Sequence, residues 1–270
     1  MNKCSMIANY PHIVAAMALL LVTACATSPM GRSQLILFPA GEMSQMGAAA
    51  FQEMKNKTPP SADAARNAYV QCVADAILQA LPGERPETWE VRVFDDDAVN
   101  AFALPGRKIG VYTGLLKVSA NQHQLATVIA HEVGHVQAQH SNERVSTNFV
   151  TQSGLQIVQV AAGADSPARQ QLFGLLGLGV QVGVLLPFSR AQEAEADLIG
   201  LDLMADAGFD PREAAKLWQN MAAASGPKPP ELLSTHPSSA RRINELSARA
   251  NTAMQRSLQA RSAGRNPDCR

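Results

Sequence analysis

The sequence predicts an α+β fold that is mainly helical and contains one small, mostly antiparallel sheet. Two Ala-rich stretches with few breakers predict scaffold helices over residues 42–55 and 62–81, and a Thr-Pro-Pro-Ser turn at residues 58–61 separates them. Three short β-prone runs follow at residues 89–94, 100–104 and 109–112. Apolar residues then recur with a helical period over residues 125–136. We therefore expect the sheet directly before this last helix and beside it.

Composition and charge fit a single folded domain. The 270 residues are 46% hydrophobic and 17% charged, which is enough apolar material to bury a sizeable core. The 23 Lys and Arg residues balance 23 Asp and Glu residues, and no basic stripe crosses the central region. This pattern argues against nucleic acid as a partner.

The first residues are typical of an export signal. Lys3 gives a weak positive start, and residues 13–22 form an uncharged apolar run that is too short to span a bilayer as a mature helix. The run ends in the sequence LVTAC, which resembles a bacterial lipobox. We expect residues 1–24 to be a lipoprotein signal peptide and Cys25 to be lipidated. An ordinary cleaved signal with an incidental Cys is the alternative.

The lipid would anchor the chain to a membrane surface. Residues 25–40 are then a lipidated tether, in which residues 34–38 form a short extended segment that Pro39 stops. The residue after Cys25 is not Asp, which by resemblance to bacterial sorting rules predicts the periplasm and the inner leaflet of the outer membrane.

Two cysteines remain for the mature domain. Cys4 would leave with the signal and Cys25 would carry lipid, so Cys72 and Cys269 are left. In an oxidising periplasm this pair could form a disulfide that ties the tail to an early helix. Two independent free thiols are the alternative, because sequence does not show how far apart the residues lie.

The helix over residues 125–136 carries an H-E-x-x-H motif. Residues i and i+4 lie one turn apart on one helix face, so His131 and His135 can aim two imidazole nitrogens at one metal ion. Glu132 points elsewhere around the helix, where it can act as a general base on a metal-bound water. A surface helix with solvated side chains is the alternative.

A second helix, over residues 189–200, supplies carboxylates. Glu193 and Asp197 are four residues apart and share a face, so one can bind the metal while the other hydrogen-bonds a ligating His. Glu195 points elsewhere. His140 lies five residues after His135, off the metal-facing line of a helix that we expect to continue towards Asn148, so we interpret it as a hydrogen-bonding residue.

Two further stretches have structural and functional interpretations. Residues 155–188 are strongly apolar and predict a buried helical hairpin, with a membrane span as the alternative. The strand around Asn100, Ala101 and Phe102 could bind an extended substrate by strand addition at a sheet edge, with a plain structural hairpin as the alternative.

Several blocks of the sequence resemble a known family. They are residues 31–34 (GRSQ), 100–106 (NAFALPG), 131–135 (HEVGH), 189–197 (SRAQEAEAD) and 234–243 (STHPSSARRI). The set resembles the zinc metallopeptidases of the CAAX prenyl endopeptidase and HtpX heat-shock protease family, most of all its soluble, lipid-anchored periplasmic group. The resemblance implies a zincin-type metallopeptidase domain over residues 41–247 and one Zn²⁺ per chain.

The resemblance also assigns roles to single residues. It makes Glu193 the third metal ligand, beside His131 and His135, and Asp197 the partner behind a ligand. It places His236 near the metal, either steadying the tetrahedral intermediate or occupying the open coordination position as a latch. Arg242 would hold that loop by a salt bridge, a part that Arg241 could also take.

The expected function is that of a zinc-dependent endopeptidase acting on misfolded or stalled envelope proteins, including outer-membrane proteins. The alternative is a non-proteolytic zinc-binding chaperone or assembly factor for outer-membrane proteins. Residues 248–270 are expected to be a polar tail, frayed helix and then disorder. Larger relatives use helical repeats to meet assembly machinery, and no such extension follows Ile243, so that partnership stays open.

Overall fold

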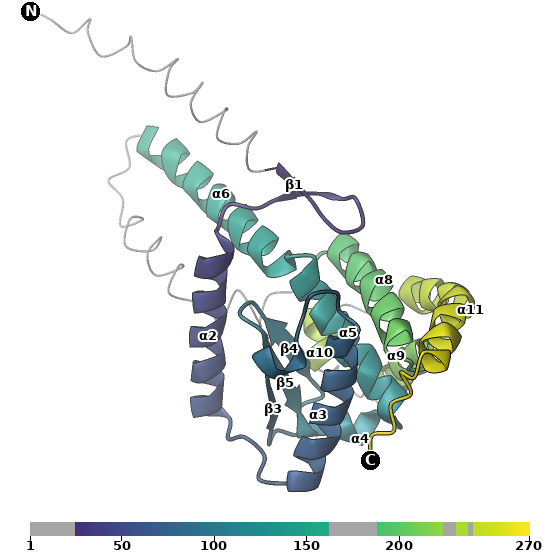
Figure 1. Cartoon of the computed structure of the whole chain (residues 1–270). Coiled ribbons are helices and arrows are strands. Elements are labelled where there is room, and N and C mark those ends of the chain that lie inside the picture. Colours follow the sequence, from purple (N-terminus) through teal and green to yellow (C-terminus); the bar gives the residue numbers. More distant parts are fainter. Residues whose placement is uncertain (1–24, 162–187, 224–230, 237–239) are drawn as a thin grey trace, which may run out of the picture.

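The computed structural model describes residues 25–161, 188–223, 231–236 and 240–270. The expected signal peptide lies outside these residues. Helices surround a small sheet, and α5 (Gln122–Gln137) runs between the sheet and α8 (Arg190–Asp206) (Figure 1). This arrangement confirms the predicted α+β class, with the sheet beside the motif helix.

The N-terminal part forms a hairpin followed by two helices. Strand β1 (Cys25–Thr27) pairs antiparallel with β2 (Ser33–Leu35), and α2 (Ala40–Lys57) and α3 (Ala64–Gln79) follow. Asp63 caps the start of helix α3, where its side chain accepts hydrogen bonds from two backbone N–H groups of the first turn. The two predicted scaffold helices are therefore confirmed.

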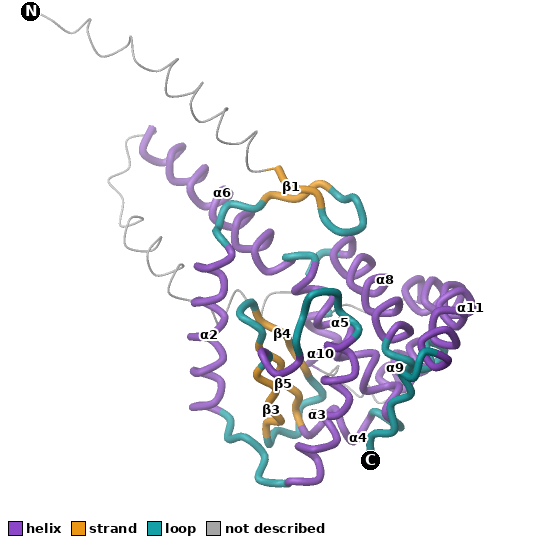
Figure 2. Tube along the Cα trace, viewed as in Figure 1, coloured by secondary structure: helices purple, strands orange, loops and turns teal. Residues whose placement is uncertain are grey.

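The main sheet has three strands and is mixed. A short 3-10 turn, η1 (Pro86–Thr88), leads into β3 (Glu90–Phe94); β4 (Ala101–Leu104) and β5 (Lys108–Tyr112) complete the sheet. The strand order is β3-β5-β4, with β3 parallel to β5 and β4 antiparallel to β5 (Figure 2).

The parallel pair departs from the mostly antiparallel sheet that we expected. After β3 the chain crosses to the far position and forms β4, and then turns back into the middle as β5. The turn between β4 and β5 contains Gly106 and Arg107, both with positive φ, at 85° and 61°. Strand β5 therefore runs in the direction of β3.

The two edges of this sheet differ. At the outer edge of β3, Ser61 N donates to Val93 O at 2.8 Å and Asp95 N donates to Pro59 O at 3.0 Å. The turn between α2 and α3 thus covers that edge. Strand β4 pairs with β5 on one side, and within the described residues no strand pairs with its other side.

The remaining helices pack around α5. They are α4 (Thr113–Val118), α6 (His140–Ala161), α8, α9 (Glu213–Ala223), α10 (Glu231–Thr235) and α11 (Ala240–Ser262). The main apolar core lies between α3, the sheet, α5, α8 and α9. A second cluster, formed by α2 and the other face of the sheet, contains Phe51, Phe94, Phe102 and Tyr112.

The expected continuous helix through His140 to Asn148 is wrong. Helix α5 ends at Gln137, and Gln139 has a φ of 53°, in the left-handed region that commonly ends a helix. Helix α6 then starts at His140 in a new direction (Figure 1). This break lets His140 face back towards α5.

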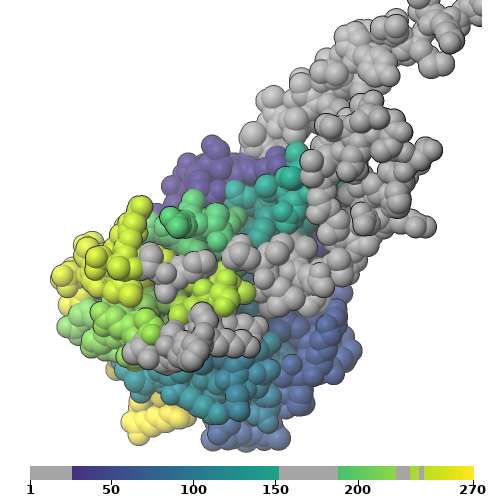
Figure 3. Space-filling model, turned by 180° about the vertical axis from the view of Figure 1, so that it is seen from behind, coloured from purple at the N-terminus to yellow at the C-terminus, as the bar shows by residue number. Residues whose placement is uncertain are grey.

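The expected disordered C-terminal tail is also wrong. Helix α11 is continuous to Ser262 and buries Leu246, Ala250, Ala253, Ser257 and Ala260, which recur with a helical period. Its contacts are with α8 and α9. Seen from behind, α10 and α11 share one face of the molecule (Figure 3).

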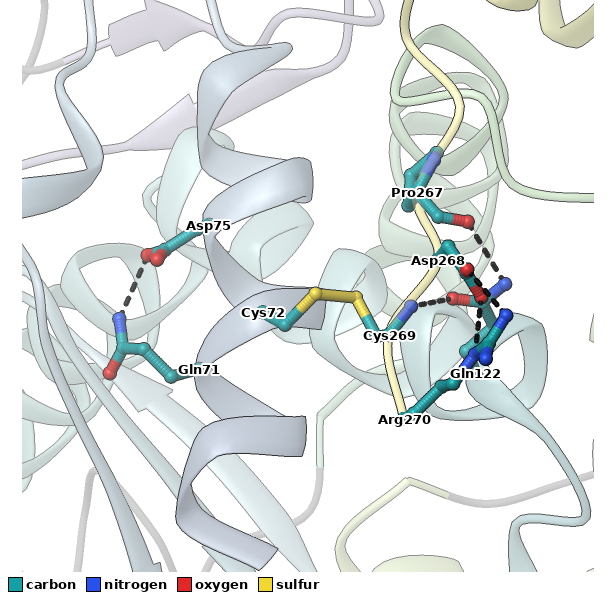
Figure 4. The surroundings of a disulfide bond; sticks show 8 residues. All are labelled: Gln71, Cys72, Asp75, Gln122, Pro267, Asp268, Cys269 and Arg270. Carbon is teal, nitrogen blue, oxygen red and sulfur yellow. Dashed lines mark hydrogen bonds and ion pairs between the residues drawn. A yellow bond between two sulfur atoms is a disulfide. The ribbon is translucent and has the colours of Figure 1, made fainter. Parts of the chain in front are cut away.

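The last residues are held by a disulfide between Cys72 and Cys269, whose Cα atoms are 5.7 Å apart. Gln122, at the start of α5, donates to Pro267 O at 3.0 Å and accepts from Cys269 N at 2.9 Å (Figure 4). Of the two cysteine alternatives, the structure has the disulfide. It joins the tail to α3 and, through Gln122, to the motif helix.

The predicted hairpin at residues 155–188 falls mostly outside the described residues. Its first part belongs to α6, which ends at Ala161. Among the helices in the described part of the chain, none combines the length and the apolar character needed to cross a bilayer.

Candidate metal centre

The H-E-x-x-H motif occupies the buried middle of α5. His131 and His135 are 3% and 1% exposed, and their Nε2 atoms lie 3.1 Å apart. The i, i+4 spacing places both rings on one side of the helix, as the sequence predicts. Two imidazole nitrogens therefore converge on one point.

Helix α8 brings a carboxylate to the same point. A capping box between Ser189 and Gln192 fixes the start of this helix and places Glu193 in its first turn. Glu193 Oε2 lies 3.5 Å from His131 Nε2, and Oε1 lies 3.4 Å from His135 Nε2. Of the two carboxylates that share a face, Glu193 is the one beside both imidazole Nε2 atoms.

Close packing of α5 on α8 makes this approach possible. A Cβ atom on Gly200 would lie 2.8 Å from His131 N, and one on Gly134 would lie 3.0 Å from Ala196 O. Neither position has room for a larger side chain without movement of a helix. The two glycines therefore bring the backbones of the ligand-bearing helices together.

His236, directly after α10, completes the cluster. Its backbone N donates to Leu232 O at 2.7 Å, which holds it at the end of that helix. Its Nδ1 lies 2.9 Å from Glu193 Oε1 and 3.2 Å from His131 Nε2. His236 thus offers a fourth donor atom to the cluster.

The four residues fit a zinc ion. One donor atom from each of His131, His135, Glu193 and His236 lies within 4.8 Å of all the others, and all four residues are buried. Imidazole and carboxylate are the ligands that zinc takes at about 2.0–2.1 Å, so donors at the corners of a tetrahedron would be about 3.3 Å apart. The donor distances given above cluster around that value.

A carboxylate and a guanidinium group lie behind His131. Its Nδ1 is 3.1 Å from Asp197 Oδ1, and Arg242 donates to both oxygens of Asp197 at 2.7 and 2.8 Å. Burial lowers the pKa of His131, but the adjacent carboxylates of Asp197 and Glu193 outweigh it and raise the pKa to about 9. Asp197 therefore fixes the ring with Nε2 facing the cluster.

Arg242 also contacts Glu193 and the residue His236. It lies 2.7 Å from Glu193 Oε2 and donates to His236 O at 3.4 Å. Asp197 and Arg242, the expected supporting residues, therefore contact each other beside the cluster, whereas Arg241 is exposed and pairs with Glu245.

Glu132 lies beside the cluster rather than in it. Its Oε2 accepts a hydrogen bond from Ala103 N of β4 at 3.3 Å, and its Oε1 is 3.3 Å from His236 Nε2. Burial raises the pKa of this carboxyl. A carboxylate with a raised pKa, next to but not among the donor atoms, is suited to accept a proton from an attacking water.

Strand β4 presents its free edge next to Glu132. Tyr112 N donates to Asn100 O, so Asn100 and Phe102 direct their backbone groups towards β5, while Ala101 and Ala103 direct theirs away from it. The Phe102 side chain packs into the second apolar cluster, against Phe51. Any contact that this strand makes with substrate would therefore use the backbone.

Behind His135 lies a group of residues whose roles the sequence motif did not reveal. His140 Nδ1 is 2.9 Å from His135 Nδ1, which confirms His140 as a hydrogen-bonding residue. Glu195, which points away from the cluster as expected, contacts His140 and Arg32. The GRSQ block contains Arg32 and was the signal that could have indicated this role.

Comparisons with known proteins are consistent with this geometry. The sequence model of peptidase family M48 matches residues 64–250. The chain is 42% identical to mitochondrial metalloendopeptidase OMA1 of Schizosaccharomyces pombe, over 66% of this chain and 51% of the relative. It is 33% identical to mitochondrial metalloendopeptidase OMA1 of Bos taurus, over 80% and 44%.

A bacterial relative is also similar. The chain is 26% identical to the beta-barrel assembly-enhancing protease of Escherichia coli, over 82% of this chain and 46% of the relative. The chain thus spans about half the length of these curated relatives.

Proposed function

Because the chain belongs to peptidase family M48, we propose that it is a zinc-dependent endopeptidase. The observation that supports this most strongly is the buried cluster of His131, His135, Glu193 and His236, with Glu132 directly beside it. A family match alone does not say whether a chain retains the chemistry. Here every donor and the base are present at spacings that suit zinc.

The division of labour follows from the geometry. His131, His135 and Glu193 hold one zinc ion, which when bound supplies a Lewis acid for the peptide carbonyl and the attacking water. Glu132 accepts the proton of that water and delivers it to the leaving amine. Asp197 and Arg242 keep the His131 ring and Glu193 in place.

The substrate is an extended polypeptide that pairs with β4. The backbone groups of Ala101 and Ala103 point to the free edge, and Ala103 N already contacts Glu132. A strand added there would have its backbone next to the general base, with little preference for particular side chains. The turn at residues 58–61 covers the other edge of the sheet, which leaves β4 for this role.

His236 acts as a latch in the resting protein. Its Nδ1 sits among the donor atoms, where it would fill the fourth coordination position that a catalytic zinc site keeps for water. Leu232 N donates to Val99 O at 3.0 Å, so α10, which His236 directly follows, is bound to the start of the β4 edge. A substrate strand that extends along β4 would compete with this contact and favour release of His236.

For location, we propose a lipid anchor at Cys25, attachment to the inner leaflet of the outer membrane, and misfolded or stalled envelope proteins as substrates. The N-terminal lipobox resemblance supports the anchor. Similarity to the beta-barrel assembly-enhancing protease of E. coli supports an envelope role. The mitochondrial relatives support the metalloendopeptidase activity and not this location.

The proposal is tested by metal content and cleavage together. Purified protein should carry about one zinc per chain, and His131→Ala should lose it. Glu132→Gln should retain zinc and lose about 10²–10⁴-fold in cleavage of an unfolded protein such as labelled casein, because only the base is removed. Glu53→Gln, a change at an exposed α2 carboxylate that pairs with Lys57, is the control and should cleave normally.

Either of two results would reject an endopeptidase: a zinc-loaded parent that cleaves no unfolded protein, or a Glu132→Gln form that cleaves as fast as the parent. A second candidate, a zinc-binding chaperone or assembly factor for outer-membrane proteins, has one observation in its favour. Four protein donors close the site in the way that structural zinc sites are closed. Full rescue of cells lacking the protein by Glu132→Gln would favour that candidate.

A further inference from the structure

We propose that Arg32, Glu195 and His140 form a relay that orients the ligand His135, so that the turn between β1 and β2 is part of the metal site. This inference rests on the proposed zinc site and concerns residues that are not ligands. Arg32 lies outside residues 64–250, the part that the family model matches. The relay extends from the N-terminal hairpin through α8 and α6 to α5.

The first step is the contact between two histidines. His140 Nδ1 and His135 Nδ1 are 2.9 Å apart and both side chains are buried, so one nitrogen must donate and the other accept. His135 must keep the lone pair of Nε2 for a metal. A neutral His135 ring therefore carries its proton on Nδ1 and donates it, and His140 Nδ1 has to be the acceptor.

Glu195 decides this direction. A carboxylate only accepts hydrogen bonds, and Glu195 Oε2 is 3.2 Å from His140 Nε2, so that nitrogen carries the proton. The neutral His140 ring then has its lone pair on Nδ1 and accepts from His135. The chain of bonds leaves His135 Nε2 free of a proton and directed at the donor cluster.

The N-terminal turn holds Glu195 as a carboxylate. Arg32 Nε donates to Glu195 Oε2 at 2.9 Å, and Met30 N donates to Oε1 at 3.2 Å. Arg32 is fixed in turn by Glu143 on α6, to which it donates with both terminal nitrogens. The guanidinium thus joins carboxylates from two helices with the fork geometry that Lys does not provide.

His131, the other motif histidine, is also backed by a carboxylate and an arginine, but without an imidazole in between. His131 contacts Asp197 directly, and Arg242 binds that carboxylate with two nitrogens. His135 lies near the end of α5, one turn farther along, and its Nδ1 is linked to the carboxylate of Glu195 through the extra imidazole of His140. Phe188 stacks on the His135 ring at 3.8 Å between centroids and leaves its edge to this bond.

The relay is tested by zinc affinity in the full chain, measured by competition with a chelator, and by the visible spectrum of the Co²⁺-loaded protein. His140→Leu removes both bonds and should weaken zinc binding about 10–100-fold, the usual cost of losing a group that orients a ligand. His140→Asn keeps an acceptor for His135 and should lose less. Glu195→Gln keeps an acceptor for His140 and should stay near the parent.

Arg32→Ala acts at the far end of the relay and should weaken zinc binding several-fold and shift the Co²⁺ spectrum. Because one chain of contacts carries both effects, Arg32→Ala combined with His140→Leu should be no weaker than His140→Leu alone. Arg256→Ala breaks a comparable arginine–carboxylate pair, to Asp206 on the surface, and is the control that should bind zinc like the parent.

The outcomes separate the relay from the proposed function. A parent that binds no zinc would reject the zinc site itself. A parent that binds and cleaves, with Arg32→Ala and His140→Leu both folded and both within twofold of the parent in zinc affinity, would overturn the relay alone. Strictly additive losses in the double variant would also overturn it.

Discussion

At the scale of single residues, His236 has the contacts that most directly affect activity. Its Nδ1 lies in the donor cluster and its Nε2 faces Glu132, so one imidazole touches both the metal position and the base. A latch and a group that stabilises the transition state would both sit there. The two roles predict effects of opposite sign.

We predict that His236→Ala raises the basal cleavage of a short unfolded peptide several-fold, because removal of the ring opens the fourth coordination position. Initial rates with zinc-saturated protein measure this. If the ring instead stabilised the transition state, the rate would fall by about 10²–10³-fold. The control is His123→Ala. His123 is a half-buried histidine at the start of α5 that accepts a hydrogen bond from Asp210 N, and its loss should leave the rate unchanged.

The residues of the site differ in how far the sequence could predict them. Helical spacing alone indicated His131, Glu132 and His135, because all three lie within five consecutive residues of one helix. Spacing left Glu193 and Asp197 equivalent, since they share a face and only the packing of α8 on α5 shows which one reaches the cluster. Arg32 depends on contacts with residues far along the chain, which no local pattern encodes.

At the scale of helices and strands, the closeness of α5 and α8 sets the distance between the ligands. We predict that Gly200→Val, which places side-chain atoms where His131 backbone lies, pushes α8 outward, lowers the free energy of unfolding by about 1–3 kcal/mol and weakens zinc binding. Urea unfolding and chelator competition measure the two effects.

Gly41→Ala is the control for this change. Gly41 is also helical, near the start of α2, but a Cβ there meets nothing within 4 Å. This variant should be as stable as the parent or slightly more stable, because Ala favours helix over Gly. Normal zinc affinity in Gly200→Val would show that the spacing of α5 and α8 does not control the site.

The elements themselves were predicted with mixed success, for physical reasons. The strands, α2, α3 and the motif helix followed from local composition and periodicity. The parallel pairing of β3 with β5 depends on which side of the sheet the chain returns to, and no local signal fixes that. The end of α5 at Gln137 was missed because it depends on the left-handed backbone of Gln139, and residues other than Gly or Asn are uncommon in that conformation at a helix end.

At the scale of the whole molecule, the disulfide connects residues 197 positions apart in sequence. A cross-link that closes so long a loop restricts the unfolded chain strongly, and loss of a native disulfide typically costs about 2–5 kcal/mol. We predict that Cys72→Ser with Cys269→Ser lowers the urea midpoint by a corresponding amount. A reductant should lower the midpoint of the parent in the same way and leave the double variant unchanged.

An unchanged midpoint in the reduced parent would contradict this prediction.

The C-terminal region differs from its sequence-based prediction at the same scale. Polar composition suggested a frayed helix and then disorder over residues 248–270, but small residues on one face of α11 let it lie against α8 and α9. The helical spacing of Ala250, Ala253 and Ser257 predicts this packing better than the polar composition of the segment does.

The unequal edges of the sheet have a consequence for self-association. Free strand edges allow two copies of a protein to pair edge to edge, and β3 is protected against this by the turn at residues 58–61. Two copies that paired through β4 would each place a strand over the other's Glu132. Such a dimer would be unable to admit a substrate, so a high concentration of the protein would lower activity per molecule rather than raise it.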